Sequence, residues 1–440
     1  MTGIIDLSLD AEALVDGAES FKTFLGLDQP RPTDRFFLIT GMTGVGKSSF
    51  VSCCTGHNAT VSHGLHSCTN NVDVFECNIE GQRIFLIDTP GFNDTTRSDV
   101  ETLEILATYL GASYANGVRI HGVLMLHPIT NNRMSGSSLR YLAFLKAICG
   151  FESYRNLVIL TTMWPEEPSP AGKQDLDDRE NELLTQQRFF GDLIAEGASL
   201  FRHYEHGHRD LHIQRISAQS IMTYILRKTD DHTMDVLQLQ RELVDEKKTL
   251  AQTTAGVLTA DYLRKARQTH ETRLSELESE RTGALGSGDT IYKQQLMNLE
   301  AEVNMDIQRV ERDCQALTRT IADLHQAETE ALKEEIARIN RRFHNEVRAK
   351  ERVLQEAQTS YLALQQEVAL IPREPRNQHT ITRRTTKQYQ NLSKARKDAE
   401  KARRGRKRVQ EYTREVMGGV MNGLAAGAIA GAMGAACEVM

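Results

Sequence analysis

One glycine-rich segment constrains the fold of this 440-residue chain more than any other, and it reads Gly41-Met42-Thr43-Gly44-Val45-Gly46-Lys47-Ser48. It follows an apolar run, Arg35–Thr40, and it precedes a stretch of helical character. Glycines at this spacing let backbone N–H groups curl around a phosphate, an approach that side chains would block. The order of strand, loop and helix therefore predicts a phosphate-binding loop, which we expect to extend to Ser49.

Residues 35–230 alternate short apolar runs with amphipathic stretches, a pattern typical of a parallel sheet between helices. We expect a doubly wound α/β domain there, with a hairpin at Glu80-Gly81-Gln82 and a helical lead-in over residues 1–34. The expected strands are Arg35–Thr40, Asn71–Ile79, Arg83–Asp88, Arg119–His127, Asn156–Thr162 and His212–Ser217. The expected helices are Lys47–Gly56, Ser98–Ala112, Ser137–Cys149, Leu176–Gly197 and Ala218–Arg227.

The residue types around the loop suit a nucleotide phosphate with Mg²⁺. Lys47 would neutralise phosphate oxygens, and the Ser48 hydroxyl would ligate the metal. Asp88 ends the third expected strand, where a carboxylate can hold the water shell of the metal. Gly91 follows in the run Asp88-Thr89-Pro90-Gly91, and its backbone N–H can sense the γ-phosphate.

A threonine between the first helix and the second strand would complete this site. Our choice is Thr69, whose hydroxyl would join the Mg²⁺ shell when a triphosphate is bound; Thr60 competes with it. The predicted metal ligands are then Ser48, Thr69 and Asp88. The groups expected to serve catalysis are Lys47, Thr69 and Gly91.

Four segments together resemble the septin-like branch of P-loop GTPases: GMTGVGKSS, HSCT, LIDTPGFNDTTRSD and TTMW. That branch includes the immunity-associated (GIMAP) GTPases, the chloroplast import-receptor GTPases and their fungal relatives. The resemblance covers about residues 35–230. It implies nucleotide at the carboxyl ends of the strands. It also implies GTP and GDP as ligands, and GTP-dependent dimerisation across the nucleotide face.

The base-reading segment departs from the family pattern. Pro165 stands in Thr162-Met163-Trp164-Pro165 where the family has an aspartate that accepts hydrogen bonds from guanine. Glu166 or Glu167 would have to replace that carboxylate, and Trp164 would either stack on the base or pack in the core. Ser217 and Ala218, in the stretch Ile216–Gln219, match the motif whose backbone contacts the base oxygen. The predicted base-binding residues are Thr162, Met163, Trp164, Glu166, Ser217 and Ala218.

A second departure lies at Phe92, which follows Gly91 where Ras-like GTPases carry a glutamine that orients the attacking water. Phenylalanine cannot orient water, so we expect slow intrinsic hydrolysis unless another group is supplied. The candidates for that group, from this chain or from a second copy, are Arg97, Arg133, His63 and His66.

From about Thr233 the composition becomes rich in Leu, Ala, Glu, Gln, Lys and Arg, and we expect a coiled coil over residues 231–375 with a break near 283–290. Pro372 and Pro375 would end it. A parallel homodimer and an antiparallel fold-back are both compatible with the pattern. One heptad seam comprises Val303, Val310, Leu317, Leu324 and Ala331, with Ile307, Cys314 and Ile321 between. A second comprises Val347, Leu354, Tyr361 and Val368, with Ala357, Leu364 and Ile371 between.

The C-terminal residues divide into a basic segment (376–415) and a Gly/Ala-rich tail (416–440) that ends Cys437-Glu438-Val439-Met440. From Arg376 to Arg408 there are thirteen Lys or Arg and two acids, a local charge of +11. This ending has the form of a prenylation signal on Cys437, and a polybasic segment is the second signal that stable anchoring needs. We expect contact with an anionic membrane through a lipidated or surface-bound tail; a tail inserted into the bilayer and a free or self-associating tail stay open as alternatives. Nucleic acid is disfavoured because interleaved aromatic residues are missing.

The sequence thus predicts a GTPase that acts as an assembly switch, with Mg²⁺ as its cofactor and a dimer or larger homo-oligomer as its working form. The absence of a visible signal peptide and the seven cysteines without a CxxC pair favour the cytoplasm, including the cytosolic face of a membrane. Two alternatives stay open: a coiled-coil scaffold whose head binds nucleotide with little turnover, and an ATPase.

Overall fold

The computed structural model describes residues 20, 23–26, 30–56, 72–92, 97–130, 134–165, 168–203, 210–230, 235–283, 290–370 and 375–433. They divide into two compact units. One unit, which we call the head unit, contains Thr69–Thr329 together with Glu19–Thr60. The other contains the helical hairpin within Glu330–Gly419.

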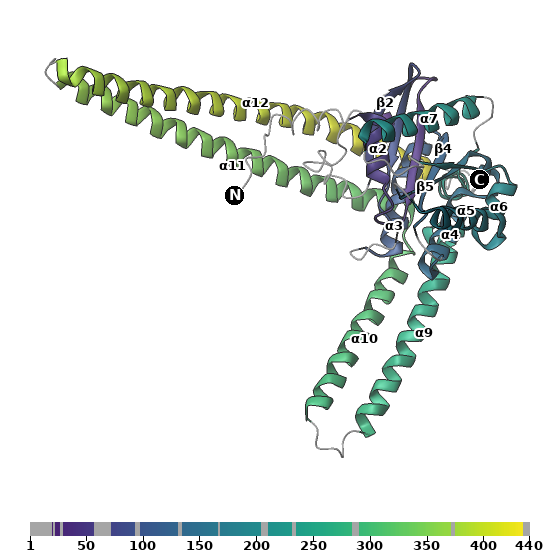
Figure 1. Cartoon of the computed structure of the whole chain (residues 1–440). Coiled ribbons are helices and arrows are strands. Elements are labelled where there is room, and N and C mark those ends of the chain that lie inside the picture. Colours follow the sequence, from purple (N-terminus) through teal and green to yellow (C-terminus); the bar gives the residue numbers. More distant parts are fainter. Residues whose placement is uncertain are drawn as a thin grey trace. The chain divides into compact units, whose positions relative to one another are not determined.

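The core of the head unit is a sheet with the strand order β2-β3-β1-β4-β5-β6 (Figure 1). Its strands are β1 (Arg35–Gly41), β2 (Asp73–Ile79), β3 (Gln82–Asp88), β4 (Gly122–Pro128), β5 (Leu157–Thr162) and β6 (Ser199–Arg202). All neighbours are parallel except β2 and β3. Glu80 and Gly81 join these two strands at φ of 51° and 81°, the positive values that a two-residue hairpin turn requires. The predicted hairpin is confirmed.

Helices cover both faces of the sheet, which confirms the doubly wound α/β fold. The chain moves from β1 to β3 in one direction and from β3 to β4 in the other, so right-handed crossovers place the connecting helices on opposite faces. On one face α2 (Lys47–Thr55) and α7 (Leu211–Asp230) bury a shared core. The remaining helices that follow strands are α3 (Asp99–Ala115), α4 (Gly136–Cys149), α5 (Pro170–Thr185) and α6 (Asp192–Ala195), with short turns at Phe151–Asn156 and Gln187–Gly191.

The prediction of a strand over His212–Ser217 is wrong, because these residues belong to α7. The buried residues of α7 are Ala218, Ile221, Met222, Ile225 and Leu226, and their spacing of three and one is helical. The last strand is β6, and its four residues are too few to show a period in the sequence. The single helix expected over Leu176–Gly197 is also wrong: α5 ends at Thr185, and Phe189 has non-helical dihedral angles.

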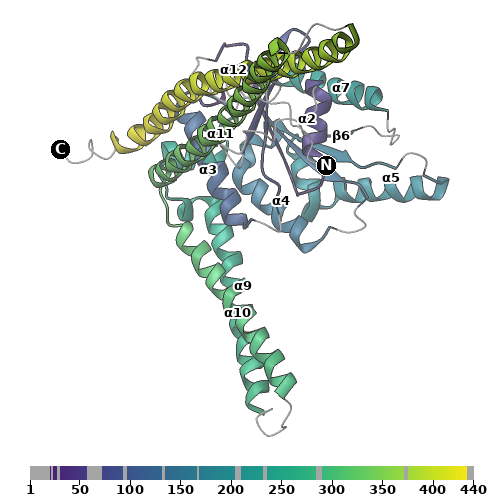
Figure 2. The same ribbon diagram turned by 90° about the vertical axis from the view of Figure 1, so that its left-hand side faces the viewer.

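Two antiparallel helices, α9 (Thr254–Gly283) and α10 (Thr290–Ala316), form a hairpin in the head unit (Figure 2). Leu277 and Leu296 are buried together with Val303 against them. Arg267 and Glu311 pair across the two helices at 3.5 Å. Helix α9 ends at Gly283 and α10 begins at Thr290, and the residues between them lie outside the described part of the chain.

The two heptad seams together predict a helix over residues 303–371, but this helix is interrupted, so a continuous coil there is wrong. A turn at Leu317–Thr320 separates α10 from α11 (Ile321–Leu370). The buried residues Leu317 and Leu324 lie at this junction. The carbonyl of Leu317 accepts a hydrogen bond from the N–H of Ala251 at 2.7 Å. Heptad spacing alone does not distinguish a seam against a helix from burial against a globular head.

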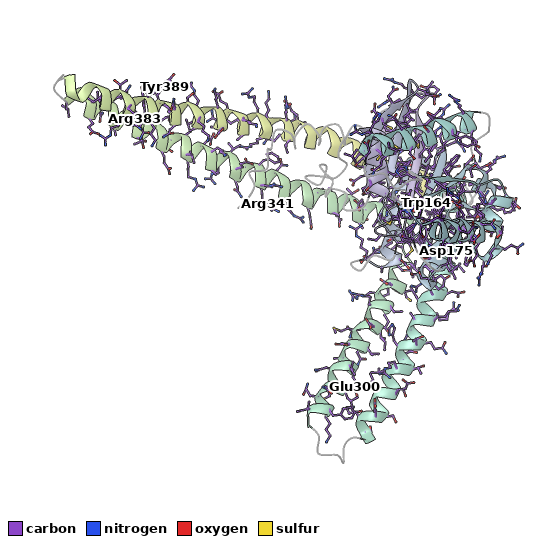
Figure 3. All side chains as sticks on the ribbon, in the orientation of Figure 1. Trp164, Asp175, Glu300, Arg341, Arg383 and Tyr389 are labelled. Atoms are coloured by element: carbon purple, nitrogen blue, oxygen red, sulfur yellow. The ribbon has the colours of Figure 1, made fainter. Side chains whose placement is uncertain are left out.

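The second unit, within Glu330–Gly419, is a hairpin of most of α11 with most of α12 (Pro375–Met433) (Figure 3). Val347 is buried, and the other seam residues described on α11 are half-buried: Leu354, Ala357, Tyr361, Leu364 and Val368. Glu351 pairs with Arg403 at 2.8 Å, and the rings of Tyr361 and Tyr389 lie 6.1 Å apart. The basic segment is therefore the returning helix of a hairpin, and α12 of the same chain covers the predicted seam.

The less exposed positions of α12 follow a heptad pattern that is absent from the sequence predictions: Ile381, Thr385, Gln388, Leu392, Ala395, Ala399, Ala402, Arg406 and Val409. Small or polar residues at six of these nine positions hide the pattern among the charges. No helix in the described part of the chain combines the length and apolarity that crossing a bilayer needs.

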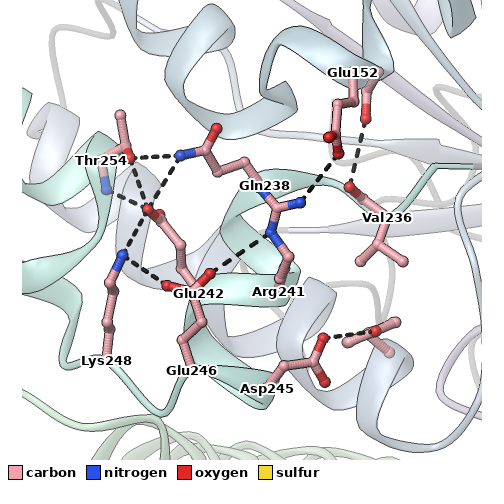
Figure 4. A network of polar contacts seen from close by, with 11 residues as sticks. Glu152, Val236, Gln238, Arg241, Glu242, Asp245, Glu246, Lys248 and Thr254 are labelled. Carbon is pink, nitrogen blue, oxygen red and sulfur yellow. Dashed lines mark hydrogen bonds and ion pairs between the residues drawn. The ribbon is translucent and has the colours of Figure 1, made fainter.

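A buried carboxylate organises the link between the sheet domain and α9 (Figure 4). This link contains α8 (Gln238–Gln240) and short turns at Arg241–Asp245 and Leu250–Gln252. Glu242 accepts hydrogen bonds from Thr254 (2.7 and 2.9 Å) and pairs with Lys248 at 3.1 Å. Burial raises the pKa of Glu242, but the hydrogen bonds from Thr254 and its neighbours lower it more, so the pKa lies below its ordinary value of 4.5.

Replacing this carboxylate should destabilise the link in a pH-dependent way. Because the pKa of Glu242 is lower in the folded chain, its stabilisation is present at neutral pH and is lost as pH falls below about 4.5. Unfolding in urea, monitored by hydrogen exchange, should give Glu242→Gln a free energy of unfolding about 2 kcal/mol lower than that of the wild type at pH 7. The difference should shrink as the pH is lowered toward about 3.5. The control is Glu246→Gln, a more exposed carboxylate on the same turn. An equal deficit at both pH values would contradict this assignment.

Candidate nucleotide-binding site

The glycine loop connects β1 to α2 with backbone that only glycine adopts readily. Gly44 and Gly46 have φ of 83° and 99°, and Gly46 is the N-cap of α2. The loop thereby points the first N–H groups of α2 toward the space above the sheet, where the helix dipole favours an anion. A β-carbon added at either glycine would meet no atom within 4 Å, so backbone conformation, and not crowding, requires glycine there.

Lys47 lies inside the loop. It is 9% exposed, and its Nζ donates to the carbonyls of Gly41 and Met42, both at 3.2 Å. The ammonium group is thus held beneath the arch that the loop N–H groups form. Phosphate oxygens entering the arch would meet a cation whose desolvation the carbonyls already offset.

Ser48 and Asp88 meet where the sequence predicts the metal. The Ser48 hydroxyl donates to Oδ2 of Asp88 at 2.9 Å, whereas Oδ1 of Asp88 is buried without a hydrogen-bond partner. Burial raises the pKa of Asp88 to about 6, although Lys47 and Ser48 lower it. A hydroxyl and an incompletely satisfied carboxylate are hard oxygen donors, the kind that Mg²⁺ prefers. The residues present therefore fit Mg²⁺.

A second acid lies beside this pair. Asp73 is directly opposite Asp88 in the β2–β3 register, and its charge also raises the pKa of Asp88. Asp73 is absent from the sequence predictions. In an antiparallel hairpin, residues at equal distances from the turn lie opposite each other. Counting from the turn at Glu80 and Gly81 would have paired Asp73 with Asp88 and so placed two carboxylates at the same end of the hairpin.

The segment after β3 is tied to the glycine loop through its backbone. The N–H of Phe92 donates to the Gly41 carbonyl at 3.3 Å, and the N–H of Thr43 donates to the Phe92 carbonyl at 3.1 Å. Gly91 fits between them because it has no side chain: a β-carbon there would lie 2.7 Å from Cα of Thr43. The loop and the segment predicted to sense the γ-phosphate are thus in direct contact.

The Phe92 side chain points away from the phosphate site. It is 3% exposed, and its ring lies 5.1 Å from that of Tyr141 and 4.6 Å from that of Phe144, both on α4. The Tyr141 hydroxyl in turn donates to Thr40 at the end of β1. Phe92 therefore anchors the segment in the core. Tyr141 and Phe144 are supporting residues that no local pattern in the sequence indicates.

Trp164, one of the predicted base-binding residues, is buried. This side chain is 6% exposed, donates to the Thr161 carbonyl at 3.3 Å and lies under the guanidinium of Arg202 at 4.4 Å. It packs in the core, so stacking on a base is not supported. The Thr162 hydroxyl donates to the Val45 carbonyl at 2.8 Å and thereby braces the loop, while Met163 is 39% exposed at a φ of 60°.

Ser217 and Ala218 do not lie in the strand-to-helix loop that the base motif needs. Both are inside α7, where the backbone N–H groups serve the helix, and Ala218 is fully buried. The Ser217 hydroxyl contacts Nδ1 of His203 at 3.1 Å. Burial lowers the pKa of His203 to about 3, so this histidine is neutral at physiological pH. His203 follows β6 directly, at the strand end that faces the base side of the site.

Several predicted residues lie outside the described residues, namely Thr69, Glu166, Glu167, His63, His66, Arg133 and Cys437. Ser49 is described and is exposed on the first turn of α2. Arg97 is partly exposed immediately before Ser98, the N-cap of α3.

Known proteins resemble part of this chain in sequence. Residues 36–136 match the family model described as "50S ribosome-binding GTPase". "GTP-binding protein A" of Dictyostelium discoideum is 26% identical over 208 residues, which are 43% of this chain and 45% of the relative. The chain thus spans less than half the length of this curated relative. With the loop geometry, these findings decide the fold class. The head has the P-loop GTPase fold.

Solved structures of chloroplast proteins are also similar. Toc33 from Arabidopsis thaliana with Mg²⁺ and GMPPNP is 17% identical and aligns over 49% of this chain and 93% of its own, with a TM-score of 0.35. A chain from a structure described as "Dimerization is important for the GTPase activity of chloroplast translocon components atToc33 and psToc159" is 15% identical, with coverages of 52% and 95% and a TM-score of 0.37.

Adding one methyl group at Gly91 should separate the phosphate sensor from the loop. The new β-carbon would lie 2.7 Å from Cα of Thr43, so the two segments must move apart. We expect Gly91→Ala to weaken Mg²⁺-dependent binding of a fluorescent GTP analogue at least tenfold, about 1.4 kcal/mol. Gly136→Ala is the matched control, because its β-carbon meets no atom within 4 Å. Unchanged affinity in Gly91→Ala would show that the observed contact is irrelevant to binding.

Proposed function

We propose that this chain is a GTP-binding and slowly GTP-hydrolysing assembly switch. The observation that carries the proposal is the meeting of Ser48 with Asp88, whose second carboxylate oxygen has no partner, beside the Lys47 ammonium. Three groups from two separate segments converge where a magnesium-bound diphosphate would sit.

Each residue has a distinct role in this proposal. The loop N–H groups from Thr43 to Ser49 bind the phosphates, and Lys47 neutralises charge that develops on them during hydrolysis. Ser48 and Asp88, with Thr69, hold Mg²⁺ directly or through water, and the bound ion supplies further charge neutralisation. The Gly91 N–H senses the γ-phosphate. Its contact with Thr43 means that a change in one segment is felt by the other.

Slow hydrolysis follows from the position of Phe92. The first side chain after Gly91 is committed to the core beside Tyr141 and Phe144, so it contributes nothing to the attacking water. A water-orienting group must come from elsewhere. In this proposal a second copy of the chain supplies or positions it, with Arg97, Arg133, His63 and His66 as candidates. Dimerisation through the head would then accelerate hydrolysis.

Base recognition in this proposal does not use the groups that the family pattern provides. Pro165 cannot accept hydrogen bonds from the base, Trp164 is buried in the core, and Ser217 and Ala218 lie inside α7. The remaining predicted groups for base recognition are Met163 and either Glu166 or Glu167. The family description and the relative named GTP-binding protein A favour guanine over adenine.

The second candidate is a scaffold whose head binds nucleotide with negligible turnover. Burial of Phe92 favours it, because the same observation that predicts slow hydrolysis is compatible with none. In both proposals the C-terminal part of the chain contacts an anionic membrane at its cytosolic face, and Cys437 is the proposed site of lipid attachment. An ATPase is the third outcome of the test below.

Release of γ-phosphate from GTP and from ATP distinguishes these functions. We expect the wild type to release phosphate from GTP, with a rate per molecule that rises with protein concentration. Lys47→Ala should lower that rate at least about 100-fold, because the developing charge loses its neutralising cation. Lys146→Ala is the control, since this lysine pairs with Asp192 away from the loop. Faster release from ATP would favour the ATPase, and no release despite GTP binding would favour the scaffold.

A further inference from the structure

Positive charge is concentrated on both helices of the α11–α12 hairpin. From the sequence alone we assign it only to the basic segment, residues 376–415. Residues 338–352 and 394–408 contain fifteen Lys or Arg and four acidic residues, a net charge of +11. The pairing of Glu351 with Arg403 places these two ranges side by side, and the Phe343 ring lies 3.9 Å from where a β-carbon on Gly405 would be. Pairing between helices therefore brings a second group of basic residues to the same level of the hairpin.

The charges form one stripe on each helix. On α11 the exposed residues Arg338, Arg341, Arg342, Arg348 and Arg352 recur at helical spacing. On α12 the exposed residues Lys394, Lys397, Lys401, Arg404 and Arg408 recur every three or four positions. We call these sets the α11 edge and the α12 edge.

The two edges face in opposite directions. At about 100° per residue, the α11 edge lies on the side of its helix opposite the buried Phe343 and Val347, which face α12. The α12 edge likewise lies away from its own buried residues, Ala395 and Ala399, which face α11. Each edge spans about 21 Å along its helix. The hairpin is thus a stiff ribbon with a straight basic row along each side.

The chemistry of the edges favours lipid phosphates over nucleic acid. A straight row of about 21 Å can meet the headgroups of a flat anionic bilayer along its whole length, whereas the phosphates of a duplex spiral away from it. Residues 338–352 contain one Phe, Tyr or Trp, the buried Phe343, and residues 394–408 contain none, so these ranges offer single-stranded bases no exposed Phe, Tyr or Trp ring to stack on. The apolar seam is already used between the helices, so attraction to the bilayer would be electrostatic.

We infer that the α11–α12 hairpin binds two anionic bilayers at once, one along each basic edge, and so tethers membranes. This inference rests on the membrane contact included in the proposed function and names the surface that makes it. Because each basic side chain near an anionic surface strengthens binding about fivefold, either edge suffices for binding. Tethering, however, needs both edges.

Unlipidated full-length chain without nucleotide tests this inference on vesicles of phosphatidylcholine with phosphatidylserine, at about 0.15 M ionic strength. The α11-edge variant is Arg341→Glu, Arg348→Glu and Arg352→Glu. The α12-edge variant is Lys397→Glu, Arg404→Glu and Arg408→Glu. The control variant makes the same charge change on α9, with Arg264→Glu, Lys265→Glu and Arg273→Glu. Co-sedimentation reports binding, turbidity reports clustering of vesicles, and circular dichroism checks that each variant is folded.

We expect the wild type and the control to bind and cluster vesicles, and each single-edge variant to bind within a few-fold of wild type without clustering. The variant that combines both edges should bind at least about 100-fold more weakly. Clustering by a single-edge variant would overturn the two-edge inference while leaving membrane contact intact. Failure of the wild type to sediment would overturn membrane contact itself. Tighter binding to a duplex RNA than to vesicles would assign the edges to nucleic acid.

Discussion

Backbone hydrogen bonds between the glycine loop and Phe92 hold the site together. The loop alone is a turn of glycines, but Phe92 binds the Gly41 carbonyl on one side and the Thr43 N–H on the other. Its ring anchors this pairing in the core next to α4. The arrangement of Lys47 and of Ser48 with Asp88 depends on it, because all of these groups extend from the two paired segments. The residue that cannot serve hydrolysis is thus the one that fixes the geometry for binding.

Much of the head could be predicted from its sequence, because local signals and the fold agree there. Glycines at positive φ, a strand before them and a helix after them leave few alternatives, and Ser48 and Asp88 meet as the motif requires. Trp164, Ser217 and Ala218 were harder, because a short match to a motif carries no information on burial. A helical spacing from Ala218 to Leu226 outweighed the brief apolar alternation before it.

The helical part shows a different limit of sequence patterns. A heptad seam indicates that a helix is covered, but not by what. Leu317 and Leu324 continue the seam of Val310 in sequence, yet they lie at the turn between α10 and α11. The seam of Val347 is covered by α12, whose own pattern is carried by alanines such as Ala395 and Ala399. Weakly apolar residues pack helices closely but give a faint periodic signal.

The central claim is that the loop, Lys47 and the Ser48–Asp88 pair form a site for a magnesium-bound guanine nucleotide. Isothermal titration of the purified chain with GDP, in the presence of Mg²⁺ and in the presence of a chelator, tests it directly. The account predicts saturable binding that needs Mg²⁺ and is stronger for GDP than for ADP. Absence of Mg²⁺-dependent affinity for either nucleotide would contradict it.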